Sequence, residues 1–182
     1  DINQLKLIFS IYKKFDSSID TSEIQKEISI RIKEELSYLQ EQKHIKLFQL
    51  IFNKSKEIKI PKVYETISTN RLISMNHLIG KKLLNFKKHP HTLRQKIAKN
   101  MFKAWYHPFY SYGIIHGDPH LGNYLSDDKG NIKLLDFGCI RIFKPSFVKG
   151  VIDLYYAIKK NNQDLAVHAY ESWGFENISK KL

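Results

Sequence analysis

The chain contains the stretch His116-Gly117-Asp118-Pro119-His120-Leu121-Gly122-Asn123 and, twelve residues later, the stretch Asp136-Phe137-Gly138. The residues between the two stretches are typical of a β-hairpin, because two short apolar runs, residues 124–125 and 132–135, flank a turn-forming segment at 127–130. A hairpin brings its two ends together. We therefore expect the polar side chains of both stretches to converge, which makes them the first candidates for a functional site.

Asp118, Asn123 and Asp136 form a set of hard oxygen ligands of the kind that Mg²⁺ prefers. Magnesium keeps water and phosphate oxygens as its other ligands, so such a site implies a nucleotide. Protein-kinase-like enzymes use an Asp to receive the proton of the nucleophile, and an Asn five residues later and the Asp of Asp-Phe-Gly to hold metal. The same spacing here indicates Asp118 as the catalytic residue and Asn123 and Asp136 as metal and cofactor ligands. Each residue alone would be better explained as satisfying loop backbone groups, and only the combination favours phosphoryl transfer.

His116 is predicted to support the catalytic loop by a hydrogen bond rather than to act as a base, and Gly138 is assigned a supporting role beside it. His120 could contact phosphate or fill space, and the residues alone do not decide. His116 and His120 stand four residues apart, but a loop containing Gly and Pro gives them no common helix face, so zinc is not favoured. One cysteine, Cys139, excludes an internal disulfide and favours a reducing, cytoplasmic setting.

Composition narrows the class of protein further. The 182 residues are 42% hydrophobic, enough to fill the core of one domain or of a large piece of one, and no apolar run reaches the length of a membrane span. The formal charge is +12, but only four of the 30 basic residues are arginine and the lysines are scattered, so a nucleic-acid partner is unlikely on these grounds. Five aromatic residues at helical spacing are expected to be core: Trp105, Tyr106, Phe109, Tyr110 and Tyr112.

Apolar periodicity predicts helices in the first part of the chain, over residues 2–15 and then from about residue 21 to about residue 53, the second unbroken or with one break. Two short strands are expected at 58–64 and 71–75, joined by a turn.

The second half of the chain is expected to be largely helical. A helix from Thr92 should be kinked or shortened by Pro108 and ended by Gly113, and further helices should begin at Pro145 and span about residues 163–173. The small sheets are grouped rather than alternating with helices, so the fold class is α+β and mostly helical.

These residues resemble a known family. The HGDPHLGN stretch followed by Leu-Leu-Asp-Phe-Gly is similar to the AarF/UbiB family of atypical, protein-kinase-like proteins, also called aarF-domain kinases. Residues 34–41, Glu-Glu-Leu-Ser-Tyr-Leu-Gln-Glu, resemble the Glu-Leu-Asp-Tyr…Glu signature of that family, and residues 60–83 resemble its next block. The resemblance covers nearly the whole chain from about residue 20.

The resemblance implies a kinase-like fold that uses ATP and Mg²⁺, in proteins that support ubiquinone biosynthesis. By position, Asp118 would be the catalytic-loop Asp, and Asn123 and Asp136 would be metal ligands. Glu41 would be the helix glutamate that pairs with the ATP-binding lysine. Glu35 would be the first acid of the signature and would have a supporting role. The partners implied are a nucleotide and a lipid or quinone precursor, with a cytoplasmic location and peripheral membrane contact.

Two departures from the family pattern stand out. Ser37 occupies the position of the second acid of the signature, and the 182 residues hold neither a Gly-rich phosphate loop nor the strand that carries the ATP-binding lysine. We therefore expect a truncated kinase, with residues 1–80 as a partial N-lobe of one long helix and two strands, and residues 81–182 as a C-lobe with the catalytic loop and Asp-Phe-Gly. Such a chain should have weak or no activity alone.

Two other functions remain open on the sequence. One is a small-molecule phosphotransferase of the aminoglycoside- or choline-kinase type, which shares the smaller pattern of Asp118, Asn123 and Asp136 but not the upstream blocks. The other is a non-catalytic pseudokinase scaffold, which Ser37 and the missing lysine would permit.

Overall fold

The computed structural model describes residues 4, 7–9, 11, 21–35 and 37–178, with the side chains of residues 21, 22, 31 and 33–35 left out. The helix predicted over residues 2–15 therefore lies largely outside the described residues. Among those described, no helix is both long and apolar enough to cross a membrane.

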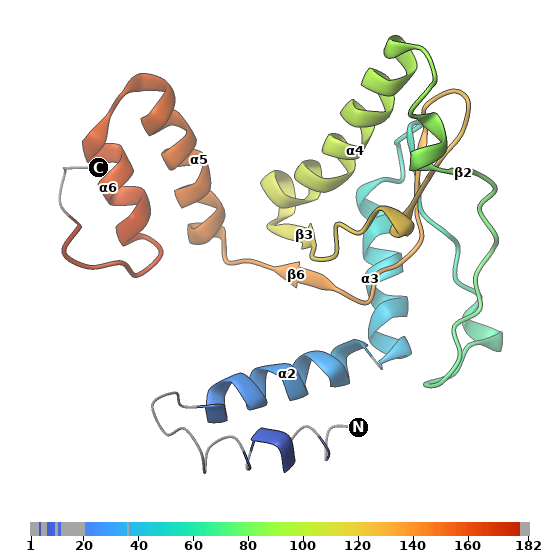
Figure 1. Ribbon diagram of the computed structural model, residues 1–182, viewed down its shortest axis with the longest axis horizontal. Helices are drawn as coiled ribbons and strands as arrows, with labels where there is room; N and C mark the ends of the chain where they lie inside the picture. The colour runs from blue at the N-terminus through green and yellow to red at the C-terminus, as the bar shows by residue number, and fades with distance from the viewer. Residues whose placement is uncertain (1–3, 5–6, 10, 12–20, 36, 179–182) are drawn as a thin grey trace.

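The long helix predicted from residue 21 is two helices. Helix α2 spans Thr21–Glu35, helix α3 spans Tyr38–Ile51, and Ser37 stands at the N-cap position of α3. The carbonyl of Ser37 accepts the first hydrogen bonds of the new helix, from the N–H groups of Gln40 and Glu41 at 2.9 and 3.0 Å. Figure 1 shows α2 meeting the lower end of α3 at a steep angle. The helix expected over residues 21–53 is therefore interrupted between Glu35 and Tyr38.

The predicted hairpin is confirmed and forms the centre of a four-stranded sheet with the order β1-β5-β4-β2. Strands β4 (Tyr124–Ser126) and β5 (Ile132–Leu134) pair antiparallel with Tyr124 opposite Leu134. The side chain of Asp127 holds the turn, since it accepts hydrogen bonds from the backbone N–H groups of Lys129 and Asn131, both at 3.0 Å. The turn thus fixes how the two strand ends meet.

Two very short strands flank the hairpin. Strand β1 (Ile58–Lys59) runs parallel to β5, and β2 (Lys81–Lys82) runs antiparallel to β4. The strand expected at 58–64 ends before Pro61, which cannot donate to a ladder. The strand expected at 71–75 is absent from the described residues, where only two isolated bridges occur, Val63 with Met75 and Thr69 with Leu72. The sheet therefore contains strands from both sides of residue 80. The division of the chain at that residue into a partial N-lobe and a C-lobe remains a prediction.

A second, two-stranded sheet leads into the catalytic loop. Strand β3 (Ile114–His116) pairs antiparallel with β6 (Ile140–Ile142), so the segments before the HGD and after the Asp-Phe-Gly lie side by side (Figure 1). Short 3-10 turns lie between the strands and helices, and they span Glu65–Ile67, Leu83–Phe86 and Leu121–Asn123.

Helix α4 (His91–Tyr112) runs through Pro108 instead of being shortened by it. It ends at Gly113, which has a φ of 69° and where an added Cβ would lie 2.8 Å from the carbonyl oxygen of Phe143. Both the left-handed backbone and the close contact therefore require glycine. The aromatic residues of α4 are core only in part, because Phe109 is buried whereas Tyr110 and Tyr112 are exposed.

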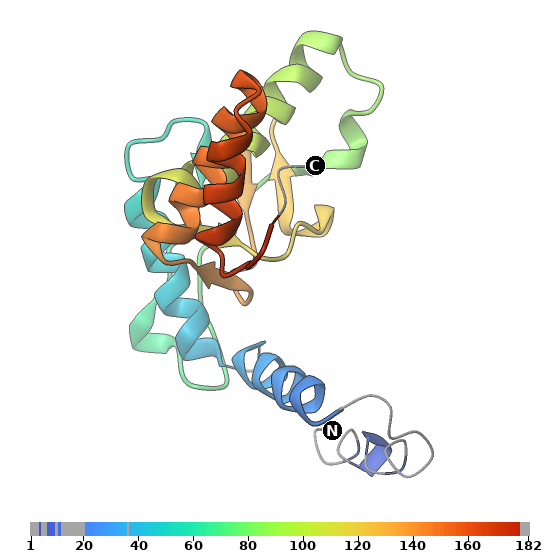
Figure 2. The same cartoon turned by 90° about the vertical axis from the view of Figure 1, so that its left-hand side faces the viewer.

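Helices α5 (Pro145–Lys160) and α6 (Gln163–Glu171) form a hairpin beyond β6. The side chain of Asn162 caps α6 by accepting from the N–H of Leu165 at 3.1 Å. Figures 1 and 2 both show the two helices packed side by side, at the far end of the molecule from β2.

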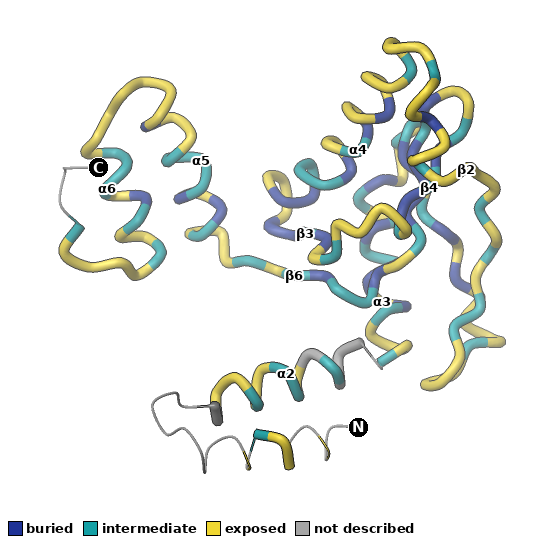
Figure 3. The backbone as a smooth tube through the Cα atoms, viewed as in Figure 1, coloured by how far each residue is buried: buried dark blue, intermediate teal, exposed yellow. Residues whose placement is uncertain are grey.

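The hydrophobic core lies where α3 packs against the hairpin, a region with many dark blue segments in Figure 3. Phe48 is at its centre, with ring centroids 5.3 Å from Phe137 and 6.2 Å from Phe52. The most deeply buried apolar side chains come from α3, the sheet and the Asp-Phe-Gly segment: Ile45, Phe48, Ile58, Ile132, Leu134 and Phe137.

We expect Phe48→Ala to lower the free energy of unfolding by about 3–5 kcal/mol, because it removes a fully buried ring and leaves a cavity. Urea unfolding followed by circular dichroism measures this change. Phe102→Ala is the matched control, since Phe102 is 62% exposed and its loss should cost less than about 0.5 kcal/mol. Equal effects of the two substitutions would contradict the placement of the core.

Candidate functional site

Hydrogen bonds at the open end of the hairpin connect the predicted site residues. The side-chain amide of Asn123 donates from Nδ2 to Oδ2 of Asp118 at 2.7 Å. The carbonyl of Asn123 accepts from the N–H of Leu135 at 3.0 Å, and Leu135 immediately precedes Asp136. The structure thus joins the catalytic loop to the start of Asp-Phe-Gly through Asn123.

Asp118 is held in its ionised form. The N–H of His120 donates to its Oδ1 at 3.1 Å and Asn123 donates to its Oδ2. These hydrogen bonds, the one from His120 being the stronger influence, lower the pKa of Asp118 despite some burial. The neighbouring phenol of Tyr124 responds in the opposite direction: its burial and the charge of Asp118 raise the pKa of Tyr124 to about 12.

His116 links the catalytic loop to the Asp-Phe-Gly segment from a fully buried position. Its Nδ1 accepts from the N–H of Asp118 at 3.3 Å, and its Nε2 lies 2.6 Å from the carbonyl oxygen of Asp136. Because Nδ1 accepts, the ring proton is on Nε2 and is donated to Asp136. The Nε1–H of Trp105 in α4 donates to the carbonyl of His116 at 2.9 Å, which fixes the loop from the other side.

Helix α3 holds the other side of this peptide group, through Glu41, and also the next peptide group, through His44. Glu41 accepts from the N–H of Phe137 at 3.4 Å, and Nδ1 of His44 donates to the carbonyl of Phe137 at 2.9 Å. Gln40 supports the other ring nitrogen of His44 at 3.0 Å. Sequence reasoning identified Glu41 but missed His44 and Trp105. The position of His44, three residues after Glu41 and thus on the same helical face, was an available signal.

Glu41 and Asp136 bring two negative charges close together. Burial, and then the charge of Asp136, raise the pKa of Glu41, while the hydrogen bond from Phe137 opposes the rise. Within the described part of the chain Glu41 has no ion pair with a lysine or arginine. The two carboxylates thus form a place that favours a cation.

The donor atoms that remain free suit magnesium. Asn123 gives its amide N–H to Asp118, which leaves its Oδ1 available, and Oδ1 of Asp136 accepts from Gly138 at 2.9 Å, which leaves its Oδ2. Two hard oxygens leave the other positions of an octahedral ion to water and phosphate. Among the described residues, no three or more His, Cys, Asp or Glu side chains form a metal-binding group.

The three supporting residues differ in what surrounds them. His116 makes the contacts given above. An added Cβ at Gly138 would lie 3.4 Å from Oδ1 of Asp136, an ordinary contact, so the backbone N–H is what Gly138 supplies here. Glu35 ends α2, and its side chain is not described.

Ser37, in place of the family Asp, lines a pocket of 500 Å³ that also borders His44 and Gly138.

The comparisons with known proteins place the chain in a family. The family model described as the ABC1 atypical kinase-like domain matches residues 1–170. The chain belongs to this family. The resemblance to the AarF/UbiB proteins, inferred from the HGDPHLGN and Asp-Phe-Gly stretches, is thereby confirmed.

Curated relatives include the chloroplastic protein ACTIVITY OF BC1 COMPLEX KINASE 8 of Arabidopsis thaliana, 23% identical over 96% of this chain and 24% of its own length. The mitochondrial atypical kinase COQ8 of Saccharomyces cerevisiae is 20% identical over 81% of this chain and 30% of its own length. The chain thus spans about a quarter to a third of these relatives.

Among solved structures, Rv3197 of Mycobacterium tuberculosis, determined in complex with erythromycin, is similar to this chain. The TM-score is 0.75 at 20% identity, and the match covers 98% of this chain and 46% of that one. At this identity the likeness supports the fold alone, and it confirms the expected kinase-like architecture with helices and small sheets.

The raised pKa of Glu41 makes a prediction for stability. The folded protein holds the proton more tightly than the unfolded chain, so the ionised carboxylate weakens the fold increasingly as the pH rises above the ordinary value of 4.5. Glu41→Gln, which keeps an acceptor for Phe137, should therefore raise the free energy of unfolding at about pH 7, by less than about 1 kcal/mol for a half-exposed group.

Urea unfolding of wild type and variant at about pH 7 and about pH 4 tests this, and the gain should disappear at the lower pH, where wild-type Glu41 is largely protonated in both states. Glu176→Gln, at an exposed position, is the control and should change neither value. A Glu41→Gln variant that is less stable than wild type at neutral pH would contradict the prediction, because it would show that the negative charge of Glu41 stabilises the fold through a favourable partner.

Proposed function

We propose that the chain is the magnesium- and ATP-binding part of an atypical kinase, with Asp118 as the catalytic residue. The observation that carries the proposal is the connected set of Asp118, Asn123 and Asp136 at the end of one hairpin, inside a domain of the ABC1 family. Asn123 and Asp136 would hold Mg²⁺ through the two oxygens left free. The ion, when bound, would neutralise charge on the phosphates of ATP.

Asp118 would receive the proton of the attacking hydroxyl or water. Its lowered pKa keeps it ionised at neutral pH, so that it is ready to accept a proton. The hydrogen bond from Asn123 orients one carboxylate oxygen, and the N–H of His120 orients the other. His116 would act as a positioning residue, because it fixes the backbone on both sides of the site and points no free nitrogen at a substrate.

Glu41 would pair with a lysine that orients the phosphates, as the family resemblance implies. No described lysine fills this role, and the 182 residues contain no Gly-rich phosphate loop. The proposed N-lobe, residues 1–80, would then be partial and the C-lobe, residues 81–182, would supply the catalytic loop. We accordingly propose that this chain binds nucleotide but turns it over weakly on its own.

For the wider role, we propose the one that the resemblance implies: support of ubiquinone biosynthesis, with a lipid or quinone precursor as partner and a cytoplasmic position in peripheral contact with a membrane. The family match and the relation to the mitochondrial atypical kinase COQ8 support this direction.

A non-catalytic, nucleotide-binding pseudokinase is the second candidate. Two observations favour it: Ser37 stands at the position of the second acid, and Glu41 lacks a cation partner among the described residues. The two candidates share the metal site and differ only in turnover, so binding and catalysis have to be measured separately.

Isothermal titration calorimetry with ATP tests the metal site. We expect binding that requires Mg²⁺ and that Asp136→Asn weakens by at least about tenfold, because the variant loses a charged ligand. Asp128→Asn is the control, since Asp128 lies on the exposed turn of the same hairpin, paired with Lys81, and should leave affinity unchanged. Equal affinity of wild type and Asp136→Asn would overturn the assignment of the metal site.

Turnover is measured by release of ADP from the purified chain. We expect a rate well below about 1 s⁻¹, the low end for ordinary enzymes, because the phosphates lack a lysine and a cradle of backbone donors. Rapid hydrolysis that Asp136→Asn abolishes would show instead that the chain is a complete catalyst, and would exclude the pseudokinase.

A further inference from the structure

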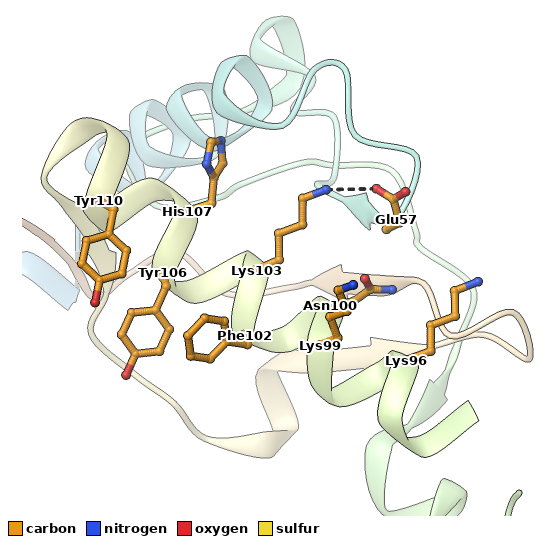
Figure 4. A pocket seen from close by; sticks show the side chains of 9 residues that line it. All are labelled: Glu57, Lys96, Lys99, Asn100, Phe102, Lys103, Tyr106, His107 and Tyr110. Carbon is orange, nitrogen blue, oxygen red and sulfur yellow. Dashed lines mark hydrogen bonds and ion pairs between the residues drawn. The ribbon is translucent and has the colours of Figure 1, made fainter. Parts of the chain in front are cut away.

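The outer face of α4 carries a pocket that the proposed active site does not use. Its volume is 580 Å³, within the range of small-molecule sites, and it is lined by residues of α4 together with Glu57 (Figure 4). The residues of α4 that matter here are of two kinds, lysines and aromatic residues: Lys96, Lys99, Lys103, Phe102, Tyr106 and Tyr110.

The lysines form a row of like charges with little compensation. Lys96, Lys99 and Lys103 are spaced three and four residues apart, so they are neighbours on one helical face and repel one another. The whole of α4 contains no Asp or Glu. Glu57 pairs with Lys103 at 3.4 Å, whereas Lys96 and Lys99 have no ion pair within the described residues. An anion placed between them would relieve this repulsion.

The aromatic residues continue the same face toward the C-terminal end of the helix. Phe102 stacks on Tyr106 with centroids 4.3 Å apart, and Tyr106 stacks on Tyr110 at 5.8 Å. Phe102 is 62% exposed and Tyr110 45% exposed, so the ladder borders solvent instead of filling the core. It offers a flat apolar surface directly beside the cations.

We propose that this pocket binds an amphipathic organic anion: one phosphate, sulfonate or carboxylate group held by Lys96 and Lys99, and an apolar body lying on Phe102, Tyr106 and Tyr110. The size of the pocket fits a single small molecule rather than a nucleic-acid strand. The absence of arginine from its lining also disfavours a nucleic acid, since bidentate contacts to phosphates and bases depend on arginine.

The pocket is also close to the catalytic loop. The ring of Tyr106 packs edge-on against Trp105 at 5.7 Å, and Trp105 donates to the carbonyl of His116. The pocket on α4 is thus linked to the predicted catalytic loop through Trp105, yet none of the residues that line the pocket belongs to the proposed active site.

A matched pair of fluorescent probes tests the proposal on the full chain. Anilinonaphthalene sulfonate carries the anion on an aromatic body, and N-phenylnaphthylamine has the same body without the charge. We expect the sulfonate to bind about tenfold more tightly, the ratio that about 1.4 kcal/mol of ionic contact provides. Lys96→Ala/Lys99→Ala should abolish this preference and leave the neutral probe unaffected, and Phe102→Ser should weaken both probes.

The control is Lys159→Ala/Lys160→Ala. It removes the same charge from two lysines that also lie over tyrosine rings, at 5.9 and 5.7 Å, but on α5 and outside this pocket. The preference should survive in this variant and in Asp136→Asn, which separates the pocket from the metal site. Equal binding of the two probes by wild type, or a preference that persists in Lys96→Ala/Lys99→Ala, would overturn the proposal.

Competition against the bound sulfonate identifies the body of the natural ligand. Displacement by a nucleoside monophosphate indicates a flat aromatic body, and displacement by a long-chain carboxylate indicates an alkyl one. Either supports the proposal when it depends on Lys96 and Lys99. Failure of both, with inorganic phosphate equally ineffective, would count against any anion site on this face.

Discussion

The peptide groups at Asp136 and Phe137 are held from two sides, and the site and the core both depend on them. His116 donates to the carbonyl of Asp136, Glu41 accepts from the N–H of Phe137, and His44 donates to its carbonyl. A buried backbone group that loses its partner costs about 1–3 kcal/mol. Helix α3, the catalytic loop and the hairpin therefore have to be in place together. The same helical turns that supply Glu41 and His44 also supply Phe48 to the core, so stability and site geometry share one element.

Electrostatics explains why this arrangement is suited to a charged ligand. The fold places Asp118, Asp136 and Glu41 around one end of a hairpin, and no described cation is paired with Glu41. The hydrogen bonds that Asp118 accepts from His120 and Asn123 outweigh its slight burial and lower its pKa. For Glu41, burial and the charge of Asp136 outweigh the single hydrogen bond from Phe137, so its pKa moves in the opposite direction. Membership of the ABC1 atypical kinase-like family is consistent with the proposed chemistry. The unequal environments of the carboxylates suggest separate tasks, proton acceptance for one and pairing with a cation for the other.

Local signals allowed much of this to be predicted. The hairpin follows from turn chemistry at residues 127–130, and the end of α4 follows from Gly113, because each is decided by a few neighbouring residues. The break at Ser37 was harder to place, since the apolar stripe continues across it and Ser37, at the N-cap position of α3, makes no side-chain capping hydrogen bond. The strand expected at 71–75 pairs with nearby residues, Val63 with Met75 and Thr69 with Leu72, but only as isolated bridges and not as a continuous ladder. His44 was missed because its partner Phe137 is 93 residues away in the sequence. Trp105 was missed because its indole donates to a backbone carbonyl, that of His116, which no side-chain motif marks.

At Gly117 a close contact, without a left-handed backbone, requires glycine. Its backbone does not have a positive φ, unlike that of Gly113, Gly130 and Gly174. Its N–H instead meets the carbonyl of Cys139 at 2.6 Å, and an added Cβ would lie 2.8 Å from the Cys139 sulfur and 3.0 Å from that carbonyl oxygen. A smaller residue at 139 would remove only the sulfur contact. In evolutionary terms, position 139 can accept other small side chains. Position 117 has to remain glycine as long as β3 and β6 are paired.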